Sequence, residues 1–142
     1  MNIGIGADHR GFAHKEYIKS SAIFNADIVW FDVGTNTDER TDYPLYVGPV
    51  CDAIKEGRIE KGILVCGSGA GMAIAANRNT GIYAAVAWNV ESARVSKQDD
   101  NTNVLVIPAD FVSKEQSIEM IRAWLRAEFK GDRYASRLKM ID

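Results

Sequence analysis

The residues with the clearest chemical potential in this sequence are a cysteine and the glycine-rich segment that follows it. Cys66 ends a short apolar run and is followed directly by Gly67-Ser68-Gly69-Ala70-Gly71. Three glycines in five residues let backbone amides turn toward an anion, and a helix that begins there adds positive potential. We therefore predict an anion cradle at residues 67–71 and a lowered pKa for the Cys66 thiol. The alternative is that Cys66 is a small buried apolar residue.

A second group of ionisable side chains lies near the amino terminus. Asp8, His9 and Arg10 follow the first apolar run and precede Gly11, where a helical pattern begins. Binding residues are frequent in loops at strand ends, so we predict functional roles for Asp8 and His9. The alternative is that Asp8 caps the helix while His9 and Arg10 are solvated. Tyr43, which ends a third polar loop, is either a substrate contact or a packing residue, and packing is the commoner role.

These residues need a scaffold, and the apolar pattern predicts a parallel sheet. Short apolar runs without polar alternation are typical of strands buried on both faces, and here they alternate with segments of helical period. The pattern predicts strands at residues 3–6, 28–31, 62–65, 82–86 and 104–107, and helices at 11–23, 43–56, 71–77, 90–97 and 113–129. We expect an α/β, doubly wound, Rossmann-like fold: a five-stranded parallel sheet with helices on both faces. Such sheets bind ligands outside the carboxyl ends of their strands.

Local residue patterns also predict how some helices begin and end. Ser113 and Gln116 have the spacing of a capping box for the last long helix. Gly48-Pro49 interrupts the second helix, which must therefore kink or begin late. A further short helix is expected in the tail, at residues 131–142.

Composition places the chain among ordinary globular proteins. Its 142 residues are 46% hydrophobic and form, by expectation, a single domain spanning residues 1–142. With 17 basic and 19 acidic residues it lacks the basic excess of a nucleic-acid-binding protein. The sequence starts without a basic leader, and no apolar run approaches a membrane span, so we expect a cytoplasmic protein with no membrane partner. Cys51 and Cys66 are then expected to be free thiols.

Several familiar motifs do not fit. The glycines complete neither a Walker phosphate loop nor a dinucleotide-binding fingerprint, and Ser68 lacks the flanking glycines of a nucleophile elbow. His9 and His14 are the only histidines, and there is no Cys-x-x-Cys pair. The sequence therefore predicts no metal site and no cofactor.

Over its whole length the sequence resembles the type B ribose-5-phosphate isomerases and the related galactose-6-phosphate isomerase subunits. The resemblance rests on an ordered set of motifs: residues 6–11, 32–35, 40–44, 66–71, 75–77 and 102–104, with Arg133 and Arg137. It implies a metal-free isomerase of the pentose phosphate pathway that interconverts an aldose phosphate and a ketose phosphate through an enediolate. By this resemblance Cys66 is the proton-transfer base and Ser68 moves protons between the substrate oxygens. An enediolate needs a positioned base and preorganised hydrogen-bond donors, which agrees with the prediction from the residues.

The resemblance also assigns substrate contacts and an assembly. The phosphate would be held by His9, Arg133 and Arg137. The family shares its sites between subunits, so the tail helix is expected to contact a neighbour in a homodimer or homotetramer, with its arginines serving the neighbour's Cys66. The remaining substrate-binding positions are Asp8, Tyr43, Gly67, Gly69, Ala70, Gly71 and Asp100.

The chain departs from the family pattern at two places. Asp99-Asp100 stands where the family usually has a His-Asn pair whose histidine opens the sugar ring, so Asp99 occupies a catalytic position with a different side chain. Asp110 aligns with an arginine that often binds phosphate. A carboxylate near a phosphate costs several kcal/mol, on the order of 4 kcal/mol at 4 Å, so Asp110 must point away or the phosphate must sit differently.

The departures leave alternatives open. A tetrose 4-phosphate such as erythrose 4-phosphate cannot close a furanose ring, so an isomerase for erythrose and erythrulose 4-phosphate needs no ring-opening group. A partner subunit, as in galactose-6-phosphate isomerase, could supply that group instead. Two other classes remain: a non-catalytic sugar-phosphate-binding subunit, and a cysteine-dependent hydrolase with His9 as its base.

Overall fold

The computed structural model describes residues 1–142 and contains one five-stranded, all-parallel sheet. The three central strands are buried almost throughout, because helices cover both of their faces. The predicted α/β fold is confirmed, and each predicted strand lies within two residues of an observed one. The order across the sheet is β2-β1-β3-β5-β4, with β1 at Asn2–Ala7, β2 at Val29–Asp32, β3 at Lys61–Cys66, β4 at Ala84–Val86 and β5 at Val104–Pro108.

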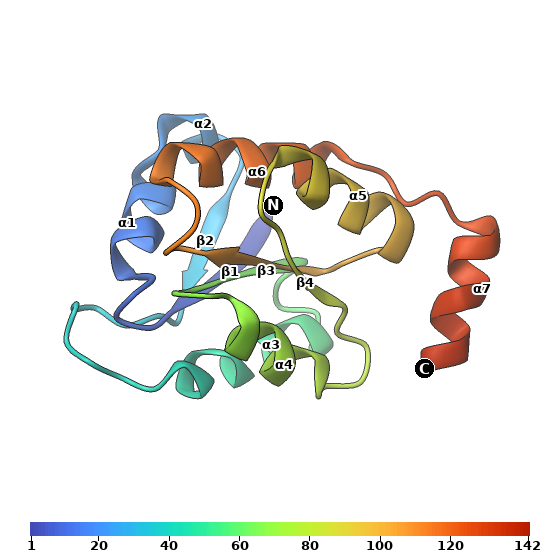
Figure 1. Cartoon of the computed structure of the whole chain (residues 1–142), viewed down its shortest axis with the longest axis horizontal. Coiled ribbons are helices and arrows are strands. Elements are labelled where there is room, and N and C mark those ends of the chain that lie inside the picture. The colour runs from blue at the N-terminus through green and yellow to red at the C-terminus, as the bar shows by residue number, and fades with distance from the viewer.

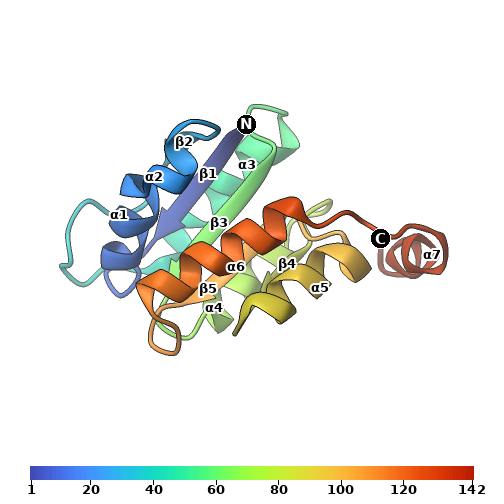
Figure 2. The same cartoon turned by 90° about the horizontal axis from the view of Figure 1, so that it is seen from above.

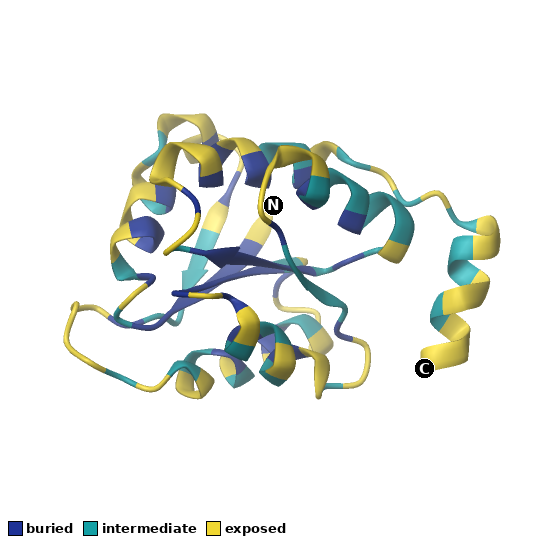
Figure 3. Cartoon of the chain, viewed as in Figure 1, coloured by how far each residue is buried: buried dark blue, intermediate teal, exposed yellow.

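Helices form a layer on each face of the sheet (Figure 1). One layer packs on the sheet through a core that includes Ile121 and Trp124, and the other through a core that includes Val50 and Met72. Figure 3 shows the sheet as the most deeply buried layer. The first layer holds α1 (Phe12–Ser20), α2 (Ala22–Asn25), α5 (Val90–Asp100) and α6 (Lys114–Arg126), and the second holds the 3₁₀ helix η1 (Tyr43–Tyr46), α3 (Gly48–Lys55) and α4 (Ala70–Asn77).

Two predicted helices are each divided in the structure. The helix predicted at residues 11–23 is broken at Ser21, whose extended backbone separates α1 from α2. The helix predicted at residues 43–56 becomes η1 followed by α3, and Pro49 lies in the first turn of α3, where no backbone donor is needed. The late start is thus confirmed. The capping box of Ser113 and Gln116 is also confirmed, but α6 ends early because Ala127 is extended.

The chain winding places a crevice at the carboxyl ends of β1 and β3. These two strands are neighbours, with Ala7 opposite Val65. The chain leaves β1 for α1 on one face of the sheet and leaves β3 for α4 on the other (Figures 1 and 2). Such a reversal point is where open α/β sheets bind ligands.

The tail helix α7 (Asp132–Ile141) stands outside the two layers. It lies beyond the edge strand β4 and contains no buried residue (Figures 2 and 3). Its base is tied to α5, because the Lys130 backbone nitrogen donates to the Gln98 carbonyl oxygen at 3.0 Å. Its end is tied to the segment before β4 by a 2.6 Å hydrogen bond from the Tyr83 hydroxyl to the Asp142 carboxylate. None of the helices has the length and apolar character needed to cross a membrane.

Candidate active site

Cys66 is the last residue of β3 and its side chain faces the start of α4. The residue is 5% exposed, and its Sγ accepts a hydrogen bond from the Gly69 amide at 3.2 Å. Gly69 has φ of +78°, a conformation that favours glycine, and this lets the chain turn from the strand into the helix. The glycine-rich segment therefore directs at least one backbone donor toward the thiol.

The predicted lowering of the Cys66 pKa is wrong for the single chain. Burial raises the pKa of this thiol, and the Asp8 carboxylate nearby raises it further. The amides of Gly69, Met72 and Ser68 oppose the rise but do not overcome it. The other cysteine, Cys51, lies fully buried in α3, where burial raises its pKa to about 11. Loss of solvent at the strand end therefore outweighs the helix-end field that the sequence pattern indicated.

Asp8 lies beside Cys66 and organises the loop after β1. Its backbone nitrogen donates to the Val65 carbonyl oxygen at 3.3 Å, and its side chain is almost fully buried. Oδ1 accepts from the backbone nitrogens of Arg10 at 3.0 Å and Gly11 at 3.1 Å. The capping role that we weighed for Asp8 is therefore present, and it leaves Oδ2 without a hydrogen-bond partner in the chain.

His9 and Tyr43 bring the loop after β2 to the same edge. His9 Nδ1 lies 3.2 Å from both the backbone nitrogen and the carbonyl oxygen of Thr41. The Tyr43 ring packs on Gly71, where an added Cβ would lie 2.5 Å from the ring. The packing role of Tyr43 is confirmed, and the packing surface is the cradle itself. The carboxyl edge thus gathers Asp8, His9, Tyr43, Cys66 and residues 67–71.

An ion pair that sequence reasoning missed covers Gly67. The Arg10 guanidinium, from the loop after β1, pairs with the Asp110 carboxylate, from the loop after β5. A Cβ on Gly67 would lie 2.7 Å from Arg10 Cζ and 2.8 Å from Asp110 Oδ2. The Asp110 carboxylate, which the resemblance would put near a phosphate, is therefore compensated by the Arg10 guanidinium. The sequence could have indicated this pair, because the loops after β1 and β5 carry opposite charges and both strands flank β3. That inference requires the strand order, which the sequence pattern does not give.

Four predicted site residues lie elsewhere in the chain. The helix α5 runs back from the end of β4 to the start of β5, so Asp99 and Asp100 lie near the amino ends of the strands. Asp99 Oδ1 accepts a 2.7 Å hydrogen bond from Lys130 Nζ, which raises the pKa of Lys130. Arg133 and Arg137 lie nearby on α7. The structure does not bring these four residues to Cys66 of the same chain.

The two tail arginines share an aromatic neighbour. The guanidinium carbons of Arg133 and Arg137 lie 4.8 and 5.3 Å from the centre of the Tyr134 ring, and Lys130 Nζ lies 4.9 Å from it. Lys130 has the Asp99 carboxylate as its partner, whereas neither arginine forms a salt bridge. We call Lys130, Arg133 and Arg137 the basic cluster. Its two arginines have no carboxylate partner in the chain and could therefore bind an anion.

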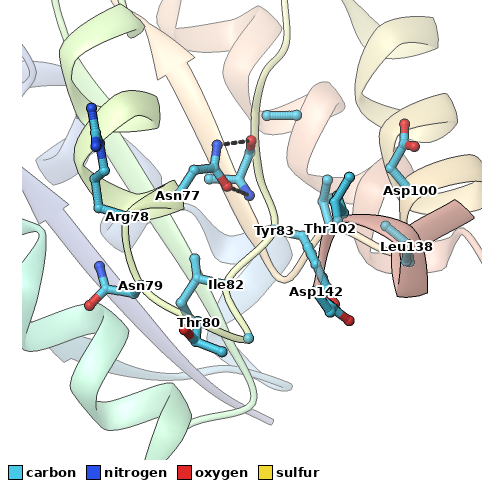
Figure 4. A pocket seen from close by; sticks show the side chains of 14 residues that line it. Asn77, Arg78, Asn79, Thr80, Ile82, Tyr83, Asp100, Thr102, Leu138 and Asp142 are labelled. Atoms are coloured by element: carbon cyan, nitrogen blue, oxygen red, sulfur yellow. Dashed lines mark hydrogen bonds between the residues drawn. The ribbon is translucent and has the colours of Figure 1, made fainter.

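The largest cavity of the chain lies away from Cys66. It measures about 530 Å³ and separates α7 from the segment before β4 (Figure 4). Asn77 closes one side through paired hydrogen bonds with the Ala84 backbone, each 2.8 Å long, and Asp100 and Leu138 line the other side. No group of three His, Cys, Asp or Glu side chains is arranged to hold a metal ion. Because residues of the tail line the cavity, we interpret it as space left between α7 and the body of the fold.

Comparison with known proteins identifies the family of this chain. A family model for Ribose/Galactose Isomerase matches residues 3–141. Ribose-5-phosphate isomerase B from Escherichia coli is 39% identical over 139 residues, which are 98% of this chain and 93% of that protein. D-erythrulose-4-phosphate isomerase from Pectobacterium atrosepticum is 33% identical over 145 residues, covering 99% and 93% of the two proteins. A crystal structure of a ribose 5-phosphate isomerase from Thermotoga maritima is similar with a TM-score of 0.95 and 36% identity, covering 99% and 97% of the two chains. The chain therefore belongs to the ribose/galactose isomerase family, and it is a sugar-phosphate isomerase that interconverts aldoses and ketoses.

Proposed function

We propose that this enzyme isomerises a small phosphorylated sugar, of the ribose 5-phosphate to ribulose 5-phosphate type, with Cys66 as the proton-transfer base. The observation that carries the proposal is the position of the Cys66 thiol. Cys66 ends a central strand, and its Sγ accepts a hydrogen bond from the Gly69 amide. The thiol lies beside Asp8, where the chain leaves neighbouring strands toward opposite faces of the sheet. A base and fixed donors at one edge are what an enediolate requires.

The reaction needs one carbon proton and one oxygen proton to move. The Cys66 thiolate removes the proton from carbon 2 of the open aldose, and the electrons of that bond form the enediolate. Amides of residues 67–71 donate hydrogen bonds to its oxygen, and the Ser68 hydroxyl moves a proton between oxygens 1 and 2. Cys66 then returns a proton to carbon 1, which gives the ketose. Ser68 is exposed at the cradle, with its Oγ accepting from the Ala70 amide at 3.2 Å.

The raised pKa of Cys66 has a direct consequence for this mechanism. At neutral pH the thiol form predominates in the free chain, since burial disfavours the thiolate. The base must then be deprotonated in a minor fraction of molecules or as the complete site assembles around substrate. In either case the rate rises with pH as the thiol loses its proton.

We propose further that each site is shared between two copies of this chain. Arg133 and Arg137 lie at the end of the fold away from the Cys66 of their own chain. Two arginines without carboxylate partners, one turn apart, present a surface suited to a phosphate dianion. A second copy of the chain would complete the site by supplying Arg133 and Arg137. The same copy would also supply Asp99 and Asp100, which lie at the same end of the fold.

The tail helix itself supports assembly with a second copy. Helix α7 has ten residues, none of them buried, and a helix of that length is marginal in water without a packing partner. Met140 and Ile141 are 83% and 74% exposed. The cavity beside α7 is also unfilled by the chain. Packing against a neighbour would bury this helix and account for its position outside the two layers.

A second substrate candidate is a tetrose phosphate. The Asp99 carboxylate accepts a hydrogen bond from Lys130 Nζ, so in this structure it is an acceptor and not the proton donor that ring opening requires. A tetrose 4-phosphate needs no ring opening. The relative from Pectobacterium atrosepticum is a D-erythrulose-4-phosphate isomerase. We therefore place erythrose 4-phosphate and erythrulose 4-phosphate beside ribose 5-phosphate as substrates to test.

The deciding experiment is a screen of phosphorylated aldoses of four to six carbons in deuterated water. We expect one aldose phosphate to give its ketose with deuterium on carbon 1, because the Cys66 base exchanges its proton with solvent. Binding without turnover of any sugar phosphate would show a non-catalytic binding subunit. Hydrolysis of an activated ester without isomerisation would favour a cysteine-dependent hydrolase.

A further inference from the structure

The ion pair of Arg10 and Asp110 occupies an informative position at the carboxyl edge. Both groups lie against Gly67, the residue that follows Cys66, and a side chain on Gly67 would displace them. The guanidinium is about half exposed, since the side-chain exposures of Arg10 and Asp110 are 55% and 35%. A permanently charged cation is thus held at the surface of the anion cradle.

The backbones of both loops are fixed to residues of the site. The Arg10 amide donates to Asp8 Oδ1 at 3.0 Å, and the Asp110 amide donates to the Gly67 carbonyl oxygen at 3.0 Å. The amide of Ala109, the residue before Asp110, donates to the Cys66 carbonyl oxygen at 2.9 Å. The backbone positions from which the two side chains extend are therefore fixed relative to the thiol.

The guanidinium keeps donors that the chain does not use. Asp110 takes one hydrogen bond from Nη2, while Nε and Nη1 donate to no other protein atom. A planar guanidinium with free donors recognises the oxygens of a phosphate, and a carboxylate partner that holds it in one orientation reduces the entropy lost on binding.

We propose that Arg10 binds the phosphate of the substrate and that Asp110 is the positioning residue that orients its guanidinium. The proposal rests on the sugar-phosphate isomerase function given above, and it adds a phosphate contact from the chain that supplies Cys66. The basic cluster of a neighbouring copy would face the phosphate from the other side. The competing explanation is an exposed ion pair without function, which contributes little to stability.

The test compares Arg10→Met with Arg58→Met. Arg58 also forms an exposed ion pair, with Glu56, but it precedes β3 at the opposite edge of the sheet. Hydrogen bonds to charged groups are strong enough that losing one weakens binding by about tenfold or more. We expect Arg10→Met to raise KM for the phosphorylated substrate, and the dissociation constant of inorganic phosphate, by about tenfold, with a smaller change in kcat. Arg58→Met is expected to change neither quantity.

Asp110 allows charge and orientation to be separated. Asp110→Ala makes the edge more positive, so charge alone predicts tighter phosphate binding. Loss of orientation predicts weaker binding, and we expect phosphate affinity to fall about threefold. Asp110→Asn keeps a side-chain oxygen that accepts from Arg10, so we expect its phosphate affinity to equal or exceed that of the wild type.

Phosphate binding is measured by calorimetry and by the shift in unfolding temperature, as well as by turnover. If Arg10→Met binds inorganic phosphate as tightly as the wild type and keeps its KM, Arg10 is a surface ion pair and the proposal fails. If Asp110→Ala binds phosphate more tightly, Asp110 does not position Arg10. The isomerase function is tested separately: if it is wrong, the wild type forms no ketose. The calorimetric test of Arg10 does not depend on this result, because phosphate binding is measured without turnover.

Discussion

Replacing Cys66 by alanine tests the proposed base, and the structure predicts how much of the effect is chemical. The thiol is 5% exposed and accepts one hydrogen bond, from the Gly69 amide. Losing that bond costs about 1 kcal/mol, and losing the buried sulfur costs about 1 kcal/mol more. For a domain of 142 residues this lowers the unfolding temperature by roughly 4–8 °C. Cys66→Ala should therefore remain folded under assay conditions.

Turnover should fall far more than stability. Removing a general base costs about 10²-fold or more, so Cys66→Ala should lose at least that factor in kcat. Cys66→Ser keeps an acceptor for the Gly69 amide, so it should be more stable than Cys66→Ala yet equally inactive. Cys51→Ala is the matched control, because Cys51 is a buried thiol in α3. It should lose stability without losing kcat.

The assay is ketose formation at several pH values, paired with thermal unfolding of each variant. Because burial raises the pKa of Cys66, the thiolate fraction grows with pH, and kcat/KM of the wild type should still be rising above pH 8. Iodoacetamide should label Cys66 before Cys51, whose pKa is about 11. A folded Cys66→Ala variant with kcat within tenfold of wild type would refute the assignment.

Three further predictions concern the assembly, the substrate and the stability of the fold. Mixing Arg137→Ala subunits with Cys66→Ala subunits should restore about a quarter of wild-type activity in a randomly mixed dimer, and a verified hybrid without activity would show that one chain builds each site. Asp99→His should raise kcat/KM for ribose 5-phosphate more than for erythrose 4-phosphate, since histidine donates a proton near neutral pH; equal effects on both would show that Asp99 does not limit ring opening. Asp32→Asn should cost about 2 kcal/mol in urea unfolding, because the fully buried Lys15 amine loses its charged partner at 2.7 Å and keeps only Glu16, at 2.9 Å. Burial raises the pKa of Asp32, but hydrogen bonds from Lys15 and Lys19 lower it overall, so the wild type should lose this stability as pH falls below about 4 and Asp32→Asn should not.

The helices and strands of this protein, and the turn that follows Cys66, were predictable from local sequence. Apolar runs of four or five residues mark the strands, and the run ending at Cys66 leads into a glycine segment that becomes the turn before α4. Strand positions follow from local apolar runs and were predicted correctly. The burial predicted for every strand holds for β1, β3 and β5, but it is wrong for the edge strands β2 and β4, which are covered on fewer sides. Where local signals were weak, as at Ser21 and Ala127, the predicted helices were too long.

Properties that depend on distant residues required the tertiary structure. The thiol pKa depends on how completely both helical layers exclude water from Cys66, and no local pattern measures that exclusion. The meeting of Arg10 with Asp110, 100 residues apart, depends on β5 pairing beside β3. The location of Asp99 at the other end of the fold depends on α5 running back across the sheet. Strand order is set by long-range packing and hydrogen bonding between segments, and it decided which of the predicted residues share one edge of the sheet.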